Sequence, residues 1–421
     1  MLVTDHDSDP IVITGIGLLS SLGLDRESTW QGLCAGRSNV RHLTGLQAIP
    51  DGLICGGVVD LPQQQPGRMK TISLAQWATT ELLRDACVTT SPVDRTRFGC
   101  SVSGHIGDTT HIGDAVGQWA PAAPGVVPWW HQFLPNTTCA TVAEQAGTQG
   151  ARTCHSVACA SGLIDILTAV RSIRDGQCDV ALCGSAEAVH PLFAAGFYQM
   201  KVLAQHEDPT QACCPFDIDR RGFVMGEGAG MLMVEKLSHA RQRGARIYAQ
   251  VMAGKMLGEA HHLTSLDDQG EAVTYLIRAA LKQAGLQPEQ IGYINAHGTG
   301  TQQNDLVEAR GIRRAFGKAA DNVLVSASKS MLGHAVNAAG SIELAITALA
   351  LRDGFAPPTI NLHRQDPQCE IDCVPLVGRR KQFEYAMKLS VAFGGHLAAV
   401  ILRRWDESDS GRPAQPVRAC A

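Results

Sequence analysis

Residues 271–297 read EAVTYLIRAALKQAGLQPEQIGYINAH, and their pattern indicates the fold class. Apolar side chains recur at helical spacing as far as Gly285, a residue typical of a helix C-terminus. Residues 291–297, IGYINAH, then predict a strand. The apolar face of the predicted helix consists of Val273, Leu276, Ile277, Ala280, Leu281 and Ala284.

The first half of the chain repeats this order. Residues 74–87 predict an amphipathic helix, and residues 98–104, FGCSVSG, predict the strand that follows. Each half then contains an apolar helix that ends in Arg-Asp-Gly, at 174–176 and at 352–354. Alternating helices and strands predict an α/β fold, and the repeated order predicts an internally duplicated chain. The face of the first helix consists of Leu74, Trp77, Ala78 and Leu82.

The two halves are expected to meet near residue 245, which gives one half at 1–245 and another at 246–404. The offset between matching segments shrinks along the chain, as expected if the first half carries an insertion at 105–150. That insertion has an irregular pattern rich in Gly, Pro and Trp, and we interpret it as a cap or subunit-contact segment. The polar tail, 405–421, is expected to be disordered.

Composition excludes several classes of function. The chain has 421 residues, of which 45% are apolar and 18% charged, and its net charge is -4. This balance offers no basic face for nucleic acid. No apolar run reaches the roughly 18 residues of a membrane helix, and the polar start lacks the features of a signal peptide. We therefore expect a cytoplasmic protein with no nucleic-acid or membrane partner.

Fourteen cysteines are scattered along the chain without any CxxC pair. A structural zinc site therefore has little support, and no metal is expected. Most of these thiols are expected to be reduced and buried as small apolar side chains.

One cysteine stands in a different context. Residues 155–162, HSVACASG, separate a strand from a helix, and small residues surround Cys159. A sharp turn there would expose the sulfur, and the helix N-terminus would favour thiolate over thiol. Such a thiolate could accept an acyl group as a thioester. The alternative is a buried cysteine at a tight junction.

A second segment, residues 295–301, reads NAHGTGT. His297 follows the predicted strand, and a neutral imidazole there could donate a hydrogen bond to a carbonyl oxygen. Thr299 and Thr301 could bind a polar, amide-bearing arm. The alternative is a histidine that caps a strand end beside threonines that serve a turn.

A third segment, residues 328–340, reads SKSMLGHAVNAAG. His334 stands at the start of a small-residue helix, whose dipole would lower the pKa of the ring and keep it neutral. Lys329 beside a glutamate such as Glu308 would form a structural ion pair, although a solvated surface lysine is the common alternative.

The fourth segment, residues 391–396, reads VAFGGH. The glycines after Phe393 would let backbone N–H groups approach a ligand closely. Paired with the N–H of Cys159, such an amide could form an oxyanion hole. The alternative is a plain β-turn.

Taken together, the four segments resemble the elongating β-ketoacyl-[acyl carrier protein] synthases of the thiolase-like superfamily, which carry a Cys-His-His triad. The resemblance runs from Ile11 to about Arg403, and further matching stretches lie at 215–217, 222–230 and 261–264. It implies a five-layer αβαβα sandwich and a dimer, either of two copies or with a related subunit.

The resemblance also implies the chemistry. Cys159 corresponds to the nucleophile, and His297 and His334 to the pair that acts in decarboxylation. The reaction would be a Claisen condensation of an acyl thioester on Cys159 with malonyl-acyl carrier protein, in fatty acid or related polyketide biosynthesis. No cofactor of its own is implied, because the phosphopantetheine arm arrives on the carrier protein.

Supporting roles follow from the same resemblance. Lys329 and Glu308 correspond to an ion pair behind the triad. Phe393 corresponds to a gate beside the acyl pocket, with its N–H in the oxyanion hole, and Thr299 and Thr301 correspond to contacts with phosphopantetheine.

This chain departs from the family pattern near its C-terminus, where His396 and Leu397 replace the usual Thr-Asn. The departure bears on the substrate more than on the chemistry and favours a synthase dedicated to one pathway. An alternative function is a non-catalytic partner subunit of the chain-length-factor kind. Such subunits lack the nucleophile, whereas Cys159 is present here.

Overall fold

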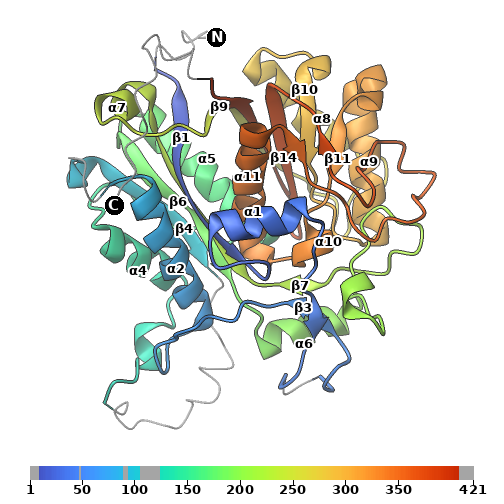
Figure 1. Ribbon diagram of the computed structural model, residues 1–421, viewed down its shortest axis with the longest axis horizontal. Helices are drawn as coiled ribbons and strands as arrows, with labels where there is room; N and C mark the ends of the chain where they lie inside the picture. Colours follow the sequence, from blue (N-terminus) through green and yellow to red (C-terminus); the bar gives the residue numbers. More distant parts are fainter. Residues whose placement is uncertain (1–8, 47–48, 89–92, 105–123, 407–421) are drawn as a thin grey trace.

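A computed structural model describes residues 9–46, 49–88, 93–104 and 124–406. Ten strands form one mixed sheet in the order β11-β10-β14-β15-β9-β1-β8-β6-β4-β5 (Figure 1). In the first half the strands are β1 Ile11–Ser20, β4 Phe98–Gly104, β5 Arg152–Thr153, β6 Val180–Glu187 and β8 Gly228–Lys236. In the second half they are β9 Ala249–Gly258, β10 Ile291–Asn295, β11 Leu324–Ser326, β14 Tyr385–Ala392 and β15 His396–Arg404.

Both halves arrange their strands in the same way. In the first, β4 pairs in parallel with β5 and β6, and β6, β8 and β1 follow in antiparallel pairs. In the second, β10 pairs in parallel with β11 and β14, and β14, β15 and β9 follow in antiparallel pairs. A short antiparallel contact between β1 and β9 joins the two sets. The predicted duplication is confirmed, and we propose a boundary near residue 245, between helix α7 (Leu237–Gln242) and β9.

Helices form three layers around these strands (Figure 1). Helices α5 and α11 contact each other and strands of both halves, so they form the central layer. Helices α2 and α4 cover the outer side of the first half, and α8 and α9 lie on the outer side of the second. The five-layer α/β sandwich is therefore confirmed. These helices are α2 Lys70–Asp85, α4 Thr137–Ala146, α5 Ser161–Arg174, α8 Glu271–Ala284, α9 Gln302–Phe316 and α11 Val336–Asp353.

The remaining elements are short. The helices are α1 Arg26–Cys34, α6 Pro191–Gln199, α7 Leu237–Gln242 and α10 Lys329–Leu332. The strands are β2 Arg41–His42, β3 Cys55–Gly57, β7 Met225–Gly226, β12 Phe355–Ala356 and β13 Arg379–Arg380.

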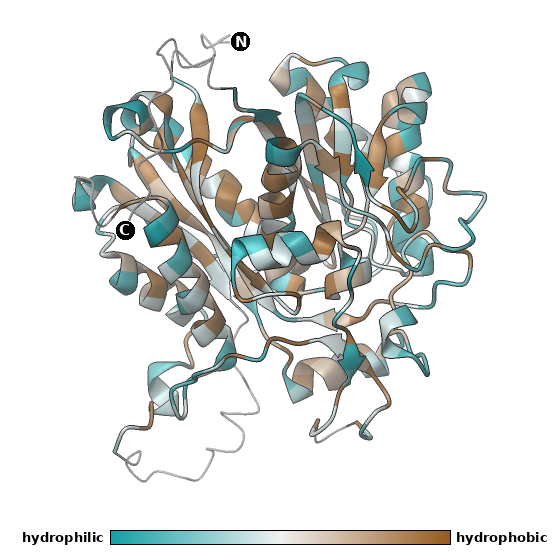
Figure 2. Cartoon of the chain, viewed as in Figure 1, coloured by the Kyte–Doolittle hydropathy of each residue, from teal (hydrophilic) through white to brown (hydrophobic). Residues whose placement is uncertain are grey.

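The main core surrounds the central layer. Every residue of α11 from Val336 to Leu351 is buried, because this helix packs between the strands of the two halves instead of facing solvent. Figure 2 shows the hydrophobic colouring concentrated on α11 and on the inner strands. A polar group on α11 therefore needs an internal partner.

The insertion at 105–150 is more regular than expected. Residues 105–123 lie outside the described part, but Thr137–Ala146 form helix α4. Cys139, Val142, Ala143 and Ala146 recur at helical spacing and are buried, and Gly147 ends the helix in a left-handed conformation. The interpretation of this stretch as irregular is thus wrong for α4. The tail predicted at 405–421 falls outside the described residues from 407 onward.

Among the described residues, no helix has the length and apolar character required to cross a membrane.

Candidate active site

Cys159 lies in a sharp turn between a strand and a central helix. A short 3₁₀ helix, Ala158–Ala160, carries it from β5 to the first turn of α5. Ala158 has φ +48°, a left-handed conformation that is strained for a residue with a Cβ. The turn holds the sulfur at one wall of a cavity, where the side chain is only 7% exposed.

Close packing behind the turn requires a glycine. A Cβ on Gly162 would overlap Ser185 Oγ and lie 2.9 Å from the amide nitrogen of Ser341 on α11. This position therefore fixes how near the nucleophile's helix comes to α11.

His334 is the nearest ionisable side chain to the sulfur. Its Nε2 lies 3.0 Å from Cys159 Sγ, and its backbone N–H donates to Val224 O at 2.6 Å. It precedes α11, and the edge of its ring meets Phe223 at a centroid distance of 5.3 Å. Nδ1 has no hydrogen-bond partner among the described residues. Either ring nitrogen of His334 can therefore carry the proton of the neutral ring.

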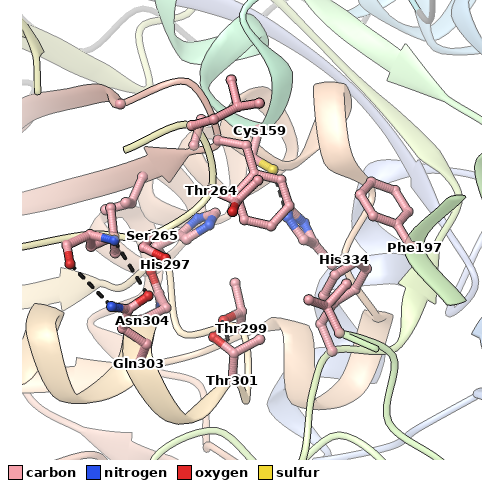
Figure 3. A pocket seen from close by; sticks show the side chains of 18 residues that line it. Cys159, Phe197, Thr264, Ser265, His297, Thr299, Thr301, Gln303, Asn304 and His334 are labelled. Atoms are coloured by element: carbon pink, nitrogen blue, oxygen red, sulfur yellow. Dashed lines mark hydrogen bonds between the residues drawn. The ribbon is translucent and has the colours of Figure 1, made fainter. Parts of the chain in front are cut away.

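His297 completes the cluster. It follows β10, and its ring stands nearly perpendicular to that of His334, at a centroid distance of 5.3 Å. Lys329 Nζ lies 3.4 Å from Nδ1 and donates to the His297 carbonyl at 2.6 Å. Because an ammonium can only donate, Nδ1 accepts, and the neutral ring holds its proton on Nε2. Figure 3 shows Cys159, His297 and His334 around one cavity.

The ion pair predicted between Lys329 and Glu308 is wrong. Lys329 Nζ pairs instead with Glu343 Oε1 at 2.6 Å. Glu308 accepts from the backbone N–H groups of His297 at 2.6 Å and Gly298 at 2.8 Å. Glu308 therefore holds the loop that carries His297, whereas Glu343, inside the apolar helix α11, neutralises the lysine.

Burial controls the ionisation of the cluster. Burial, followed by the positive charge of Lys329, lowers the pKa of both His297 and His334 well below the usual range, so both rings are neutral. The predicted direction for His334 is confirmed, although burial and neighbouring lysines cause it. Burial raises the pKa of Cys159 to about 12, and the charge of Lys329 opposes this only in part. Burial thus opposes the preference for thiolate expected from the helix N-terminus, and the thiol must lose its proton during the reaction.

The triad faces a cavity of about 170 Å³ whose lining is mostly apolar. Thr299 and Thr301 line it, with their hydroxyl oxygens 2.9 Å apart. Phe393 lies in the turn between β14 and β15 and also lines it, half-buried. Every predicted site residue except Lys329 and Glu308 thus lines this cavity, and those two lie directly behind His297.

Several lining residues were not singled out as site residues from the sequence. Thr264 lies in a stretch noted for its family resemblance, as does Phe223. Phe197 on α6 and Val202 just after it carry no local signal, because their role depends on how this part of the chain packs. The others are Leu263, Ser265, Leu266, Gln303, Asn304, Val391, Ala392 and Gly395.

The donor atoms of Cys159, His297 and His334 lie within 4.8 Å of one another, a spacing that could suit a metal ion. However, Lys329 and Lys388 lower the pKa of both rings through their positive charge. The same charges oppose a divalent cation.

Comparison with known proteins finds relatives that match nearly the whole chain. The family models described as "Beta-ketoacyl synthase, N-terminal domain" and "Beta-ketoacyl synthase, C-terminal domain" match residues 62–240 and 248–363. The tetracenomycin polyketide synthase ketoacyl synthase alpha subunit of Streptomyces glaucescens is 35% identical over 97% of this chain and 100% of its own. The 3-oxoacyl-[acyl-carrier-protein] synthase 2 of Vibrio cholerae is 37% identical over 94% of this chain and 99% of its own.

Solved structures of ketosynthases also superpose on this chain. A type II polyketide ketosynthase in complex with its acyl-carrier protein superposes with a TM-score of 0.87 at 30% identity, covering 95% of this chain and 100% of that one. The ishigamide ketosynthase/chain length factor superposes with a TM-score of 0.83 at 30% identity, covering 94% and 100%.

Proposed function

The chain belongs to the β-ketoacyl synthase family, and on this premise we propose that it is a 3-oxoacyl-[acyl-carrier-protein] synthase that uses Cys159, His297 and His334. The observation that carries the assignment of residues is the 3.0 Å contact between Cys159 Sγ and His334 Nε2, with His297 across the same cavity. The reaction is a decarboxylative Claisen condensation in fatty acid or related polyketide biosynthesis.

The first half of the reaction transfers an acyl chain to Cys159. The sulfur attacks the acyl carbon of an acyl-carrier thioester, while the thiol proton passes to His334 Nε2. The bond to the carrier's sulfur breaks, and that sulfur leaves as a thiol with the proton. A base in contact with the sulfur is needed because the pKa of Cys159 is about 12.

The second half forms the new carbon–carbon bond. Malonyl-carrier thioester loses its carboxylate as carbon dioxide, and the electron pair forms an enolate. The Nε2–H of His297, whose tautomer Lys329 fixes, donates to the enolate oxygen. His334 donates as well when its proton is on Nε2. The enolate carbon attacks the thioester carbonyl, the bond to Cys159 Sγ breaks, the sulfur takes up one proton from solvent, and a 3-oxoacyl thioester departs.

The cavity supports the remaining roles. We assign Thr299 and Thr301 to the amides of the phosphopantetheine arm, because their hydroxyls face the cavity beside His297. We assign Phe393 to a gate, with its N–H in an oxyanion hole together with that of Cys159. These steps use no cofactor of the protein's own.

An acyl carrier protein is the proposed partner for both substrates, and the synthase is proposed to act as a dimer. One related structure is described as a complex with an acyl-carrier protein and another as a ketosynthase with its chain length factor. Both a homodimer and a heterodimer are therefore compatible with the family. A non-catalytic partner subunit is the weaker alternative, because the triad is complete.

The test is a condensation assay with acyl- and malonyl-carrier proteins. We expect equal amounts of carbon dioxide and 3-oxoacyl-carrier protein from the wild type and no product from Cys159→Ala. Condensation of the corresponding coenzyme A esters at an equal rate would contradict the assignment of a carrier-dependent synthase.

A further inference from the structure

A second lysine lies buried behind the triad. Lys388 on β14 is 0% exposed, and its Nζ lies 2.7 Å from Glu343 Oε2 and donates to Ala296 O at 3.2 Å. A buried ammonium is expensive unless it is paired. A lysine in the middle of an inner strand therefore requires either a structural or a functional explanation.

The placement of Lys388 couples it to the triad by two routes. The first runs through Glu343, whose two carboxylate oxygens are divided between Lys329 at 2.6 Å and Lys388 at 2.7 Å. Lys329 in turn contacts His297. The second runs through the backbone, because the acceptor Ala296 immediately precedes His297 and the neighbouring Asn295 is in register with Lys388.

Burial lowers the pKa of Lys388 to about 8 while Glu343 opposes the fall, so below that pH Lys388 adds a second positive charge to the cluster. Two ammonium groups face Glu343 and Glu308, and burial raises the pKa of Glu308 to about 7 while Lys388 opposes the rise. The positive charge of Lys388 also acts on both histidines. The titratable groups that interact with Lys388 are His297 after β10, Glu308 on α9, Lys329 on α10, and His334 and Glu343 before and on α11.

We infer that Lys388 is a positioning residue for decarboxylation: its buried ammonium holds Glu343, and through it Lys329, behind His297. Its positive charge also opposes protonation of both histidines. The inference rests on the proposed condensing activity. This role distinguishes Lys388 from a core residue with a purely structural role. Replacing such a core residue would change the stability of the fold but not the ionisation of the triad.

The direction of the effect follows from the sign of the charge. Decarboxylation needs neutral imidazoles, so the rate falls when the pH drops through the pKa of the rings. Removing Lys388 removes a positive charge that lowers the pKa of both rings. The acidic limb of the pH–rate profile therefore moves to higher pH, by about one unit. On that limb this shift equals about a tenfold loss at a fixed pH.

The experiment measures carbon dioxide released from malonyl-carrier protein, from the lowest pH at which the proteins stay folded up to pH 9, for the wild type and for Lys388→Met. Met387→Leu is the matched control, because Met387 is a buried neighbour on the same strand and the change alters packing without altering charge. The control should keep the wild-type limb. An upward shift in Lys388→Met alone supports the inference, and superimposable profiles of Lys388→Met and the control overturn it.

Lys388→Gln serves as a second variant, since its amide can still donate to Ala296 O and protect the fold. It should show the same upward shift. If neither variant folds, judged by circular dichroism, Lys388 is required for the fold and the positioning role is overturned. A wild type that releases no carbon dioxide would instead refute the condensing activity itself.

Discussion

Replacing Glu343 with Gln tests how the charges behind the triad are organised. The change keeps the shape of the side chain but removes the negative charge that lies 2.6 Å from Lys329 Nζ and 2.7 Å from Lys388 Nζ. Breaking a buried ion pair by neutralising one partner costs about 3–5 kcal/mol. Because the amide oxygen can still accept one hydrogen bond, we expect a loss in the free energy of unfolding of about 3 kcal/mol.

This loss corresponds to a modest shift in the melting temperature. At roughly 2.1 cal/mol/K per residue, unfolding of 421 residues has an entropy of about 0.9 kcal/mol/K. A loss of about 3 kcal/mol therefore lowers Tm by about 3 °C. The catalytic effect should be larger: Lys329 no longer fixes the His297 tautomer, so carbon dioxide release falls about a hundredfold.

Glu235→Gln is the matched control for this prediction. Glu235 is 0% exposed on β8 and pairs with Arg243 and His239, and none of the three lines the catalytic cavity. The control should lower Tm by a similar amount and leave the rate of decarboxylation at the wild-type level. Equal rates for Glu343→Gln and Glu235→Gln would refute the role given to Glu343.

Three further predictions follow from the same geometry. Burial raises the pKa of Cys159 to about 12, so the fraction of thiolate should still be rising at pH 9. The rate of alkylation of Cys159 by iodoacetamide should therefore increase about tenfold per pH unit from pH 7 to 9. A plateau of that rate near pH 8 would contradict this. Gly162→Ala should lower Tm by several degrees, because its Cβ would overlap Ser185 Oγ. Gly196→Ala, in a helix position with open space around it, should leave Tm unchanged. Equal melting curves for the two variants would rule out the packing argument. Thr301→Val should raise KM for acyl-carrier protein by about tenfold with little change in kcat, if its hydroxyl contributes one hydrogen bond to the arm; an unchanged KM would remove Thr301 from that role.

The fold class was predictable because each helix and strand shows its pattern within a short stretch of sequence. The helix and strand of residues 271–297 show their periodicity within a short window, and the first half repeats the same order. How α5 and α11 lie between the two sets of strands follows from long-range packing, which no local window contains. Helix α4 was missed because a single short helix, Thr137–Ala146, lies within a stretch that is irregular as a whole.

The triad was predictable for a different reason. Cys159, His297 and His334 each lie at the junction of an apolar element with a run of small residues, and the resemblance of four such junctions set their roles. The partner of Lys329 was misjudged because Glu308 follows the His297 segment closely. Glu343 carried a signal of its own, as an acidic residue within the otherwise apolar run of α11.

The ionisation of Cys159 shows the limit of local reasoning. The helix N-terminus favours a thiolate, and the sequence places Cys159 beside it. Whether burial outweighs that effect depends on the walls of the cavity, which come from residues far apart in the chain.

Intact-protein mass spectrometry after incubation with acyl-carrier proteins of several chain lengths tests the central assignment most directly. We predict a mass gain of one acyl group on the wild type, no gain on Cys159→Ala, and loss of the adduct when malonyl-carrier protein is added. The chain length that loads best would identify the substrate class. A folded wild type that gains no mass with any chain, or a Cys159→Ala variant that gains the same mass, would contradict Cys159 as the acyl acceptor.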